Sequence, residues 1–164
     1  MNAIDTSHST RALTASTVAF TVCFAVWTIF SIIGLQIRQD LHLSKTEFGL
    51  LVGTPILTGS LIRLVLGIWT DQYGGRLVYV AVMLSAAIAT FLLTHVSTYP
   101  MFSVTALGIG IAGGSFAVGV AYVSRWFPPE RQGIALGIFG LGNVGAAVTK
   151  FTAPFVRIGS GARL

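Results

Sequence analysis

Residues 48–70 read FGLLVGTPILTGSLIRLVLGIWT, a run of apolar and small side chains with a single charge, Arg63. A helix needs about 20 mostly apolar residues to cross the hydrocarbon core of a bilayer. Inside lipid, every backbone amide must find its partner within the segment, which excludes isolated strands. The run therefore predicts a transmembrane helix.

Four further apolar runs flank this one. Because the connections are short, consecutive helices are expected to lie side by side and antiparallel. The sequence predicts an all-α membrane protein whose helices occupy 18–156, after an N-terminal tail at 1–17. The five predicted helices are 18–35, 48–70, 77–94, 100–123 and 132–156.

The composition agrees with a bilayer environment. Of 164 residues, 54% are hydrophobic and 9% are charged, against roughly 25% charged in soluble domains. The net charge of +5 does not indicate nucleic-acid binding, because the basic residues are scattered singly. The lone Cys23 lies in an apolar run and is expected to be a small buried side chain.

The basic residues between the helices predict the orientation. Cytoplasmic loops favour Lys and Arg, so we expect a multi-pass protein of the inner (plasma) membrane with a cytoplasmic N-terminus. Arg157 and Arg163 would level the count if the last segment were included. Outside that segment, the N-terminal side carries Arg11, Arg76, Arg125 and Arg131, and the opposite side carries Arg38 and Lys45.

The number of helices is odd, and five helices cannot form a bundle of paired repeats. The last residues, FVRIGSGARL, follow the fifth predicted helix directly. We therefore expect an N-terminal fragment of a larger bundle, with 157–164 as its truncated end.

Arg63 is the main candidate for ligand binding. An arginine near the centre of a membrane helix costs at least about 2.5–3.5 kcal/mol, and no Asp or Glu lies inside the predicted helices. An anionic ligand, a carboxylate outside this chain or backbone carbonyls remain as partners. Gly59 and Gly67 share its helix face and leave room for a ligand, and a guanidinium offers parallel donors to a planar oxyanion.

The fifth predicted helix contains five glycines, at 133, 137, 140, 142 and 145. Small residues permit close helix packing in membranes, which is the expected role of most of them and of GIGIAGGSFAVG at 108–119. The Asn143 amide needs hydrogen-bond partners at this depth and can donate to an oxyanion. Lys150 is expected either to attract anions or to extend to the interface.

The sequence contains none of the usual motifs of enzymes or cofactor sites. There is no HExxH, cysteine pair, GxSxG or phosphate-binding loop, and His95 has no companion at metal-ligand spacing. We expect no enzymatic activity, no metal and no cofactor.

The loop GIWTDQYGGR at 67–76 resembles the signature loop of the major facilitator superfamily. Gly67, Asp71, Gly74 and Arg76 match its pattern of glycine, three residues, Asp, two residues and glycine, followed by basic residues. Gln72 and Gly75 stand where many members carry basic side chains. We expect these matching residues to act in conformational change.

Further motifs are similar to the nitrate/nitrite porter family within that superfamily. GIFGLGNVGAA at 137–147 resembles its glycine-rich nitrate signature, and RWFPPERQGIALG at 125–137 resembles the loop before it. The resemblance covers the five predicted helices almost continuously. It makes Phe24 the expected nitrate-stacking ring and Arg63, Gly142 and Asn143 the expected substrate-binding residues.

The resemblance implies a twelve-helix transporter of two six-helix halves that binds its substrate between them. Its members exchange nitrate for nitrite or couple nitrate to protons. A second arginine in the other half would complete the site. Two alternatives stay open: transport of another small anion, and a truncated product without transport activity.

Overall fold

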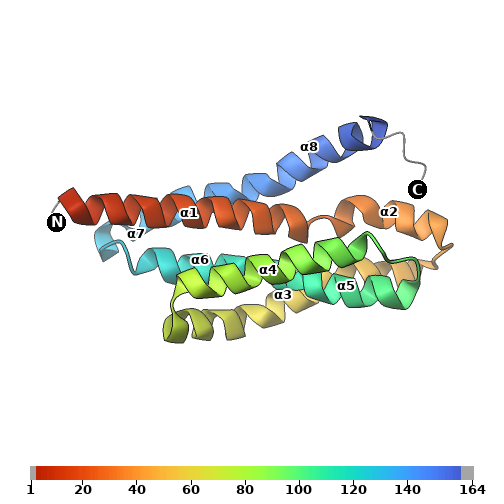
Figure 1. Cartoon of the computed structure of the whole chain (residues 1–164), viewed down its shortest axis with the longest axis horizontal. Helices are drawn as coiled ribbons and strands as arrows, with labels where there is room; N and C mark the ends of the chain where they lie inside the picture. Colours follow the sequence, from red (N-terminus) through yellow and green to blue (C-terminus); the bar gives the residue numbers. More distant parts are fainter. Residues whose placement is uncertain (1–2, 160–164) are drawn as a thin grey trace.

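The described part of the chain, residues 3–159 of a computed structural model, is helical throughout apart from short connections. The helices form an elongated bundle of antiparallel rods (Figure 1). Their bounds are α1 Ala3–Trp27, α2 Phe30–Asp40, α3 Lys45–Tyr73, α4 Gly75–Leu93, α5 Tyr99–Ala112, α6 Ser115–Ser124, α7 Pro129–Gly140, the 3₁₀ turn η1 Leu141–Asn143, and α8 Val144–Gly159.

Within residues 3–159, five stretches are long and apolar enough to span a bilayer, which confirms the predicted number of transmembrane helices. Two of them, α3 and α4, are single helices, whereas each of the others is interrupted part-way along its length (Figure 1). The five spans are Ser7–Asp40, Lys45–Tyr73, Gly75–Leu93, Tyr99–Ser124 and Pro129–Thr152.

The interruptions have local causes. At the first, the Ile29 amide bonds the Val26 carbonyl, three residues earlier instead of four, and the Thr28 hydroxyl donates to the carbonyls of Phe24 and Ala25. At the second, Gly113 and Gly114 form two turns in which each amide bonds the carbonyl three residues earlier. Glycine weakens a helix at such points because it gains the most freedom when the helix opens.

The first helix begins earlier than expected. Residues 1–17 were expected to form a tail, but the chain is helical from Ala3 and continuous with the first span. Ser9 and Ser16 are buried, and the Ser9 hydroxyl donates to the Trp126 carbonyl at 3.1 Å. This segment packs against the α6–α7 connection. A count of apolar residues could therefore not predict where α1 begins. At the other end, residues 160–164 of the segment 157–164 lie outside the described residues.

Gly74 alone joins α3 to α4, and its φ of 85° lies in the left-handed region, where glycine is favoured. A side chain at the next residue, Gly75, would collide with the Tyr122 ring. Glycine at position 75 therefore lets the start of α4 pack closely against α6.

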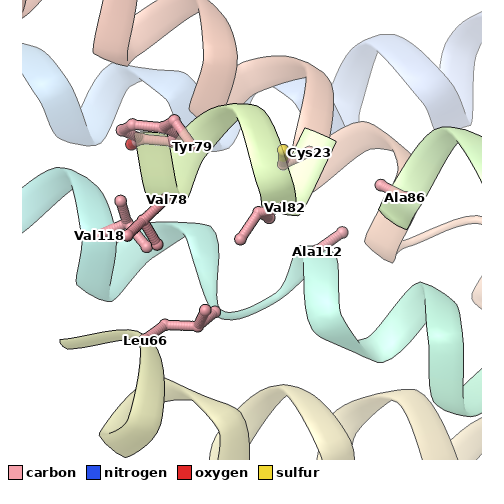
Figure 2. Close-up of a cluster of buried hydrophobic side chains, with 8 residues drawn as sticks. All are labelled: Cys23, Leu66, Val78, Tyr79, Val82, Ala86, Ala112 and Val118. Carbon is pink, nitrogen blue, oxygen red and sulfur yellow. The ribbon is translucent and has the colours of Figure 1, made fainter. Parts of the chain in front are cut away.

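In the described part of the chain, three clusters of buried side chains lie between the helices. The central one brings together side chains from α1, α3, α4, α5 and α6 (Figure 2). Cys23 is 1% exposed in this cluster, which confirms the prediction of a buried cysteine. The members of the central cluster are Cys23, Leu66, Val78, Tyr79, Val82, Ala86, Ala112 and Val118.

Glycines allow the helices to approach closely at several crossings. Gly119 lies directly under the Phe139 ring, and Gly145 lies against the Thr21 carbonyl of α1. The predicted packing role of the 108–119 stretch is therefore confirmed. In the fifth span it holds only for the last two glycines, because a side chain at Gly133, Gly137 or Gly140 would meet no atom.

Candidate functional site

Arg63 is half-buried in the middle of α3. Its Nε donates to the Gly113 carbonyl at 3.3 Å, and its Cζ lies 6.0 Å from the centre of the Phe116 ring. Within the described residues, no carboxylate pairs with Arg63; the ion pair found there joins Asp71 and Arg125. One backbone carbonyl thus holds the guanidinium, and its terminal nitrogens make no hydrogen bond to the described residues.

The surroundings of Arg63 are the broken regions of two spans. The Trp27 indole, at the end of α1, donates to the Pro55 carbonyl of α3 at 3.0 Å and lies against Gly113 at the α5–α6 break. Gly59 approaches the Gly110 carbonyl so closely that a Cβ would come within 3.0 Å of it. Gly67 faces open space instead, so of the two glycines predicted to give Arg63 room, only Gly59 lies at a close crossing.

A cluster of aromatic rings extends from Arg63 toward α1 and α7. Phe116 lies 5.5 Å from Phe20, which in turn lies 5.4 Å from Phe24 and 4.9 Å from Phe139, all between ring centroids. Phe24 is half-buried and also contacts Trp27. The structure thus connects Phe24 with Arg63 through two intervening rings.

Phe116 is the site residue that the sequence did not reveal. The stretch that contains it was assigned to packing alone, yet its ring is 38% exposed and lies beside the guanidinium. A cation over a ring face gains about 0.5–2 kcal/mol, more when it is desolvated. The sequence signal for Phe116 was its position directly after two glycines and a serine, because such small neighbours leave a large ring uncovered.

The predicted site residues of the fifth span, Gly142, Asn143 and Lys150, do not contact Arg63. Asn143 is exposed, and its amide donates to the Gly140 carbonyl at 2.8 Å within η1. Gly142 is buried against the Phe20 ring, so it serves the packing of η1 on α1. Lys150 is exposed on α8. No contact among the described residues joins Asn143 or Lys150 to Arg63.

The signature loop lies at one end of the bundle. Asp71, near the end of α3, accepts a hydrogen bond from Arg125 at 2.9 Å, and Arg125 also donates to the Asp71 carbonyl at 3.3 Å. Arg76 is exposed in the first turn of α4. This loop therefore couples the ends of α3 and α6 and lies apart from the guanidinium.

One hollow of the surface lies apart from Arg63. It is a groove of about 600 Å³ between α3 and α4, lined almost entirely by apolar side chains such as Leu66, Trp69 and Val82. Such a lining offers an anion no donors. This groove therefore lacks the donors that the Arg63 guanidinium carries.

No group of three His, Cys, Asp or Glu side chains among the described residues could hold a metal ion. His95 is exposed at the end of α4, where its ring contacts Phe91. The Trp27 indole N–H is taken up by the Pro55 carbonyl, so the donors left for a ligand near Arg63 are those of its own guanidinium.

Comparison with known protein families identifies the fold. The family described as "Major Facilitator Superfamily" matches residues 15–155. The chain belongs to the Major Facilitator Superfamily. The five membrane spans are accordingly those of an incomplete superfamily bundle, as the signature loop predicted.

Relatives within the superfamily confirm the predicted resemblance to nitrate/nitrite porters. A "Probable nitrate/nitrite antiporter" of Thermus thermophilus is 46% identical over 144 residues, which are 88% of this chain and 32% of that protein. The "Nitrite extrusion protein" of Bacillus subtilis is 36% identical over 135 residues, 81% of this chain and 34% of that protein. The chain spans about a third of the length of these relatives.

Proposed function

We propose that these five spans are the N-terminal part of a transporter that moves nitrate and nitrite across the membrane by alternating access. The observation that carries the proposal is the half-buried Arg63, whose guanidinium has no carboxylate partner among the described residues and keeps its terminal nitrogens free. The names of the superfamily relatives support the choice of substrate. The proposal assigns the chain no enzymatic activity.

The chemistry of Arg63 suits a small planar anion. With Nε bonded to the Gly113 carbonyl, the edge formed by the two terminal nitrogens offers two parallel N–H donors. Nitrate and nitrite can each accept both with adjacent oxygens, as carboxylates do in bidentate pairs. The Phe116 ring beside the guanidinium and the Phe24 ring farther along the aromatic cluster offer flat faces on which a planar anion can stack, with less competition from water than at an exposed site.

Transport requires that the anion reach this site from each side in turn. In superfamily members one half of the bundle moves against the other around a central site. We propose that Gly67, Asp71, Gly74 and Arg76 control this movement, because Asp71 holds the end of α3 to α6 through Arg125. Asn143 and Gly142 are proposed to line the path of the substrate along the fifth span, and Lys150 is proposed to attract anions toward it.

The first test is Arg63→Lys in a transporter of the relatives' full length whose first five spans are these residues. A lysine keeps the charge but loses the planar fork, so nitrate uptake into proteoliposomes is expected to be abolished without loss of folded protein. Arg38→Lys is the matched control, because Arg38 also lies over a ring, that of Phe48, at 5.5 Å, but at the end of α2. Normal uptake by the Arg63 variant would refute the assignment of this residue.

Competition separates nitrate transport from transport of another small anion. Nitrate and nitrite are expected to inhibit labelled nitrate uptake at lower concentrations than chloride or formate. Stronger inhibition by formate would reassign the site to a carboxylate.

The mode of coupling is tested in the same liposomes. We propose exchange of nitrate for nitrite or symport of nitrate with protons. Nitrate uptake driven by internal nitrite without a pH gradient would establish exchange, and uptake that requires an inward proton gradient would establish symport.

A further inference from the structure

Arg63 owes its orientation to a carbonyl that a helix break releases. In an uninterrupted helix, the Gly113 carbonyl would accept the amide of Ala117. Here the Ala117 amide bonds the Gly114 carbonyl at 3.1 Å, and the Gly113 carbonyl accepts Arg63 Nε at 3.3 Å. The break between α5 and α6 therefore supplies the acceptor that fixes the plane of the guanidinium.

The Trp27 indole holds this break against α3. A Cβ on Gly113 would lie 2.6 Å from the indole nitrogen and 2.8 Å from a second ring atom, so the five-membered part of the ring lies directly on Gly113. The same nitrogen donates to the Pro55 carbonyl of α3 at 3.0 Å. One side chain thus contacts both the helix that carries Arg63 and the segment that accepts its hydrogen bond.

The Trp27 indole is closely packed between α3 and the break at Gly113. Gly59 lies about one turn after Pro55 on α3, and a Cβ on Gly59 would come within 3.1 Å of the indole nitrogen and 3.4 Å of the Gly113 Cα. Interiors packed this closely transmit small displacements to their neighbours. A change at Trp27 or Gly113 is therefore expected to move the carbonyl that holds Arg63.

We propose that Trp27 and Gly113 are positioning residues that hold the Arg63 guanidinium with its terminal edge turned to the anion. This inference rests on the proposed function, because it assigns these two residues a role in the affinity for nitrate. They do not touch the substrate; they act through Arg63. Bidentate recognition depends on such fixed geometry, since a misplaced fork loses one of its two hydrogen bonds.

The test replaces the indole N–H in the same full-length transporter. Trp27→Phe removes the donor, and the KM for nitrate is expected to rise roughly three- to tenfold, the size of one lost hydrogen bond, with kcat changed less than about twofold. Substitution of Trp27 by benzothienylalanine, which keeps the fused-ring shape without the N–H, is expected to give the same rise in KM. Trp69→Phe is the matched control, because Trp69 is 47% exposed on α3.

Gly113→Ala tests the second residue. Its added methyl would collide with the indole, so the KM is expected to rise in the parent protein and to rise much less in the Trp27→Phe background, where the five-membered part of the ring is missing. Such non-additivity is the mark of residues in contact. Gly53→Ala is the control, because a side chain there meets no atom.

The outcomes separate this inference from the proposed function. An unchanged KM in both folded Trp27 variants would overturn the positioning role, while an inactive Arg63→Lys variant would still uphold nitrate transport at Arg63. Normal uptake by Arg63→Lys would overturn both. A fall in kcat or in the thermal midpoint with an unchanged KM would show that Trp27 only stabilises the bundle.

Discussion

Arg38 and Arg63 both lie beside a phenylalanine ring, but they differ in how far they lie from the end of the membrane span. Arg38 lies 5.5 Å from the Phe48 ring and Arg63 lies 6.0 Å from the Phe116 ring. Arg38 is in the last turn of α2, where water can solvate its charge. Arg63 lies mid-span, where an unpaired charge is costly, so a bound anion lowers its free energy far more.

The Asp71–Arg125 ion pair is a second residue-scale feature that can be tested. Its side chains are 64% and 50% exposed, and exposed pairs contribute about 0–1 kcal/mol. We expect Asp71→Asn to lower the free energy of unfolding by less than about 1 kcal/mol, measured by denaturant titration in detergent.

Transport by the same Asp71 variant is expected to fall several-fold, since the pair couples the ends of two helices at the proposed moving loop. Arg125→Lys, which keeps the charge, is the control and should retain more activity. A loss of stability above about 2 kcal/mol would contradict this account and make the pair structural.

At the scale of elements, the interruptions in three spans were not predicted. A count of apolar residues is the same for a straight helix and for one with a break. The breaks at Ile29 and at Gly113 are turns in which backbone amides bond the carbonyl three residues earlier. The number of spans and the close glycine crossings followed from composition. The positions of the breaks could not be predicted from that count.

The crossing of α8 over α1 gives the prediction at this scale. Gly145 is buried against the Thr21 carbonyl, so Gly145→Val is expected to lower the free energy of unfolding by about 1–3 kcal/mol through overpacking. Gly133→Ala is the control, because its methyl meets no atom and alanine favours a helix over glycine. Equal losses in the two variants, measured by thermal unfolding in detergent, would show that glycine spacing does not determine this crossing.

At the scale of the whole molecule, the connections gather at two ends. The N-terminal part of α1, the α3–α4 joint and the α6–α7 connection lie at one end, and the α2–α3 and α4–α5 connections lie at the other (Figure 1). The ends contain the residues that the charge count placed on opposite sides. The proposed cytoplasmic N-terminus assigns the first of these ends to the cytoplasm.

Cysteine labelling tests this orientation. Cys23 is 1% exposed, so the unmodified chain should not react with a membrane-impermeant maleimide. In intact cells we expect labelling of His95→Cys and no labelling of Gln72→Cys until the membrane is permeabilised, because these exposed residues lie at opposite ends. The reverse pattern would place the N-terminus outside.

The sequence predicted the number of spans, the superfamily and the buried cysteine, because all three depend on local composition or motif. It selected Arg63 because an arginine inside an apolar run is unusual. It missed Phe116 and the Gly113 carbonyl because a ring or a backbone oxygen acquires its role only when two distant helices meet. The substrate-binding role of Asn143 stays a prediction, since its amide donates to the Gly140 carbonyl one turn earlier and no described contact joins it to Arg63.

The single-residue joint at Gly74 affects how the protein is made. Only one residue separates α3 from α4. We therefore expect the two helices to insert into the bilayer together, as a helical hairpin. After Arg76, α4 carries no charge, and each of its Leu, Ile, Phe and Val side chains favours the membrane centre by about 0.3–0.6 kcal/mol. During biogenesis, the apolar second arm would thus carry the arginine of the first arm into the lipid.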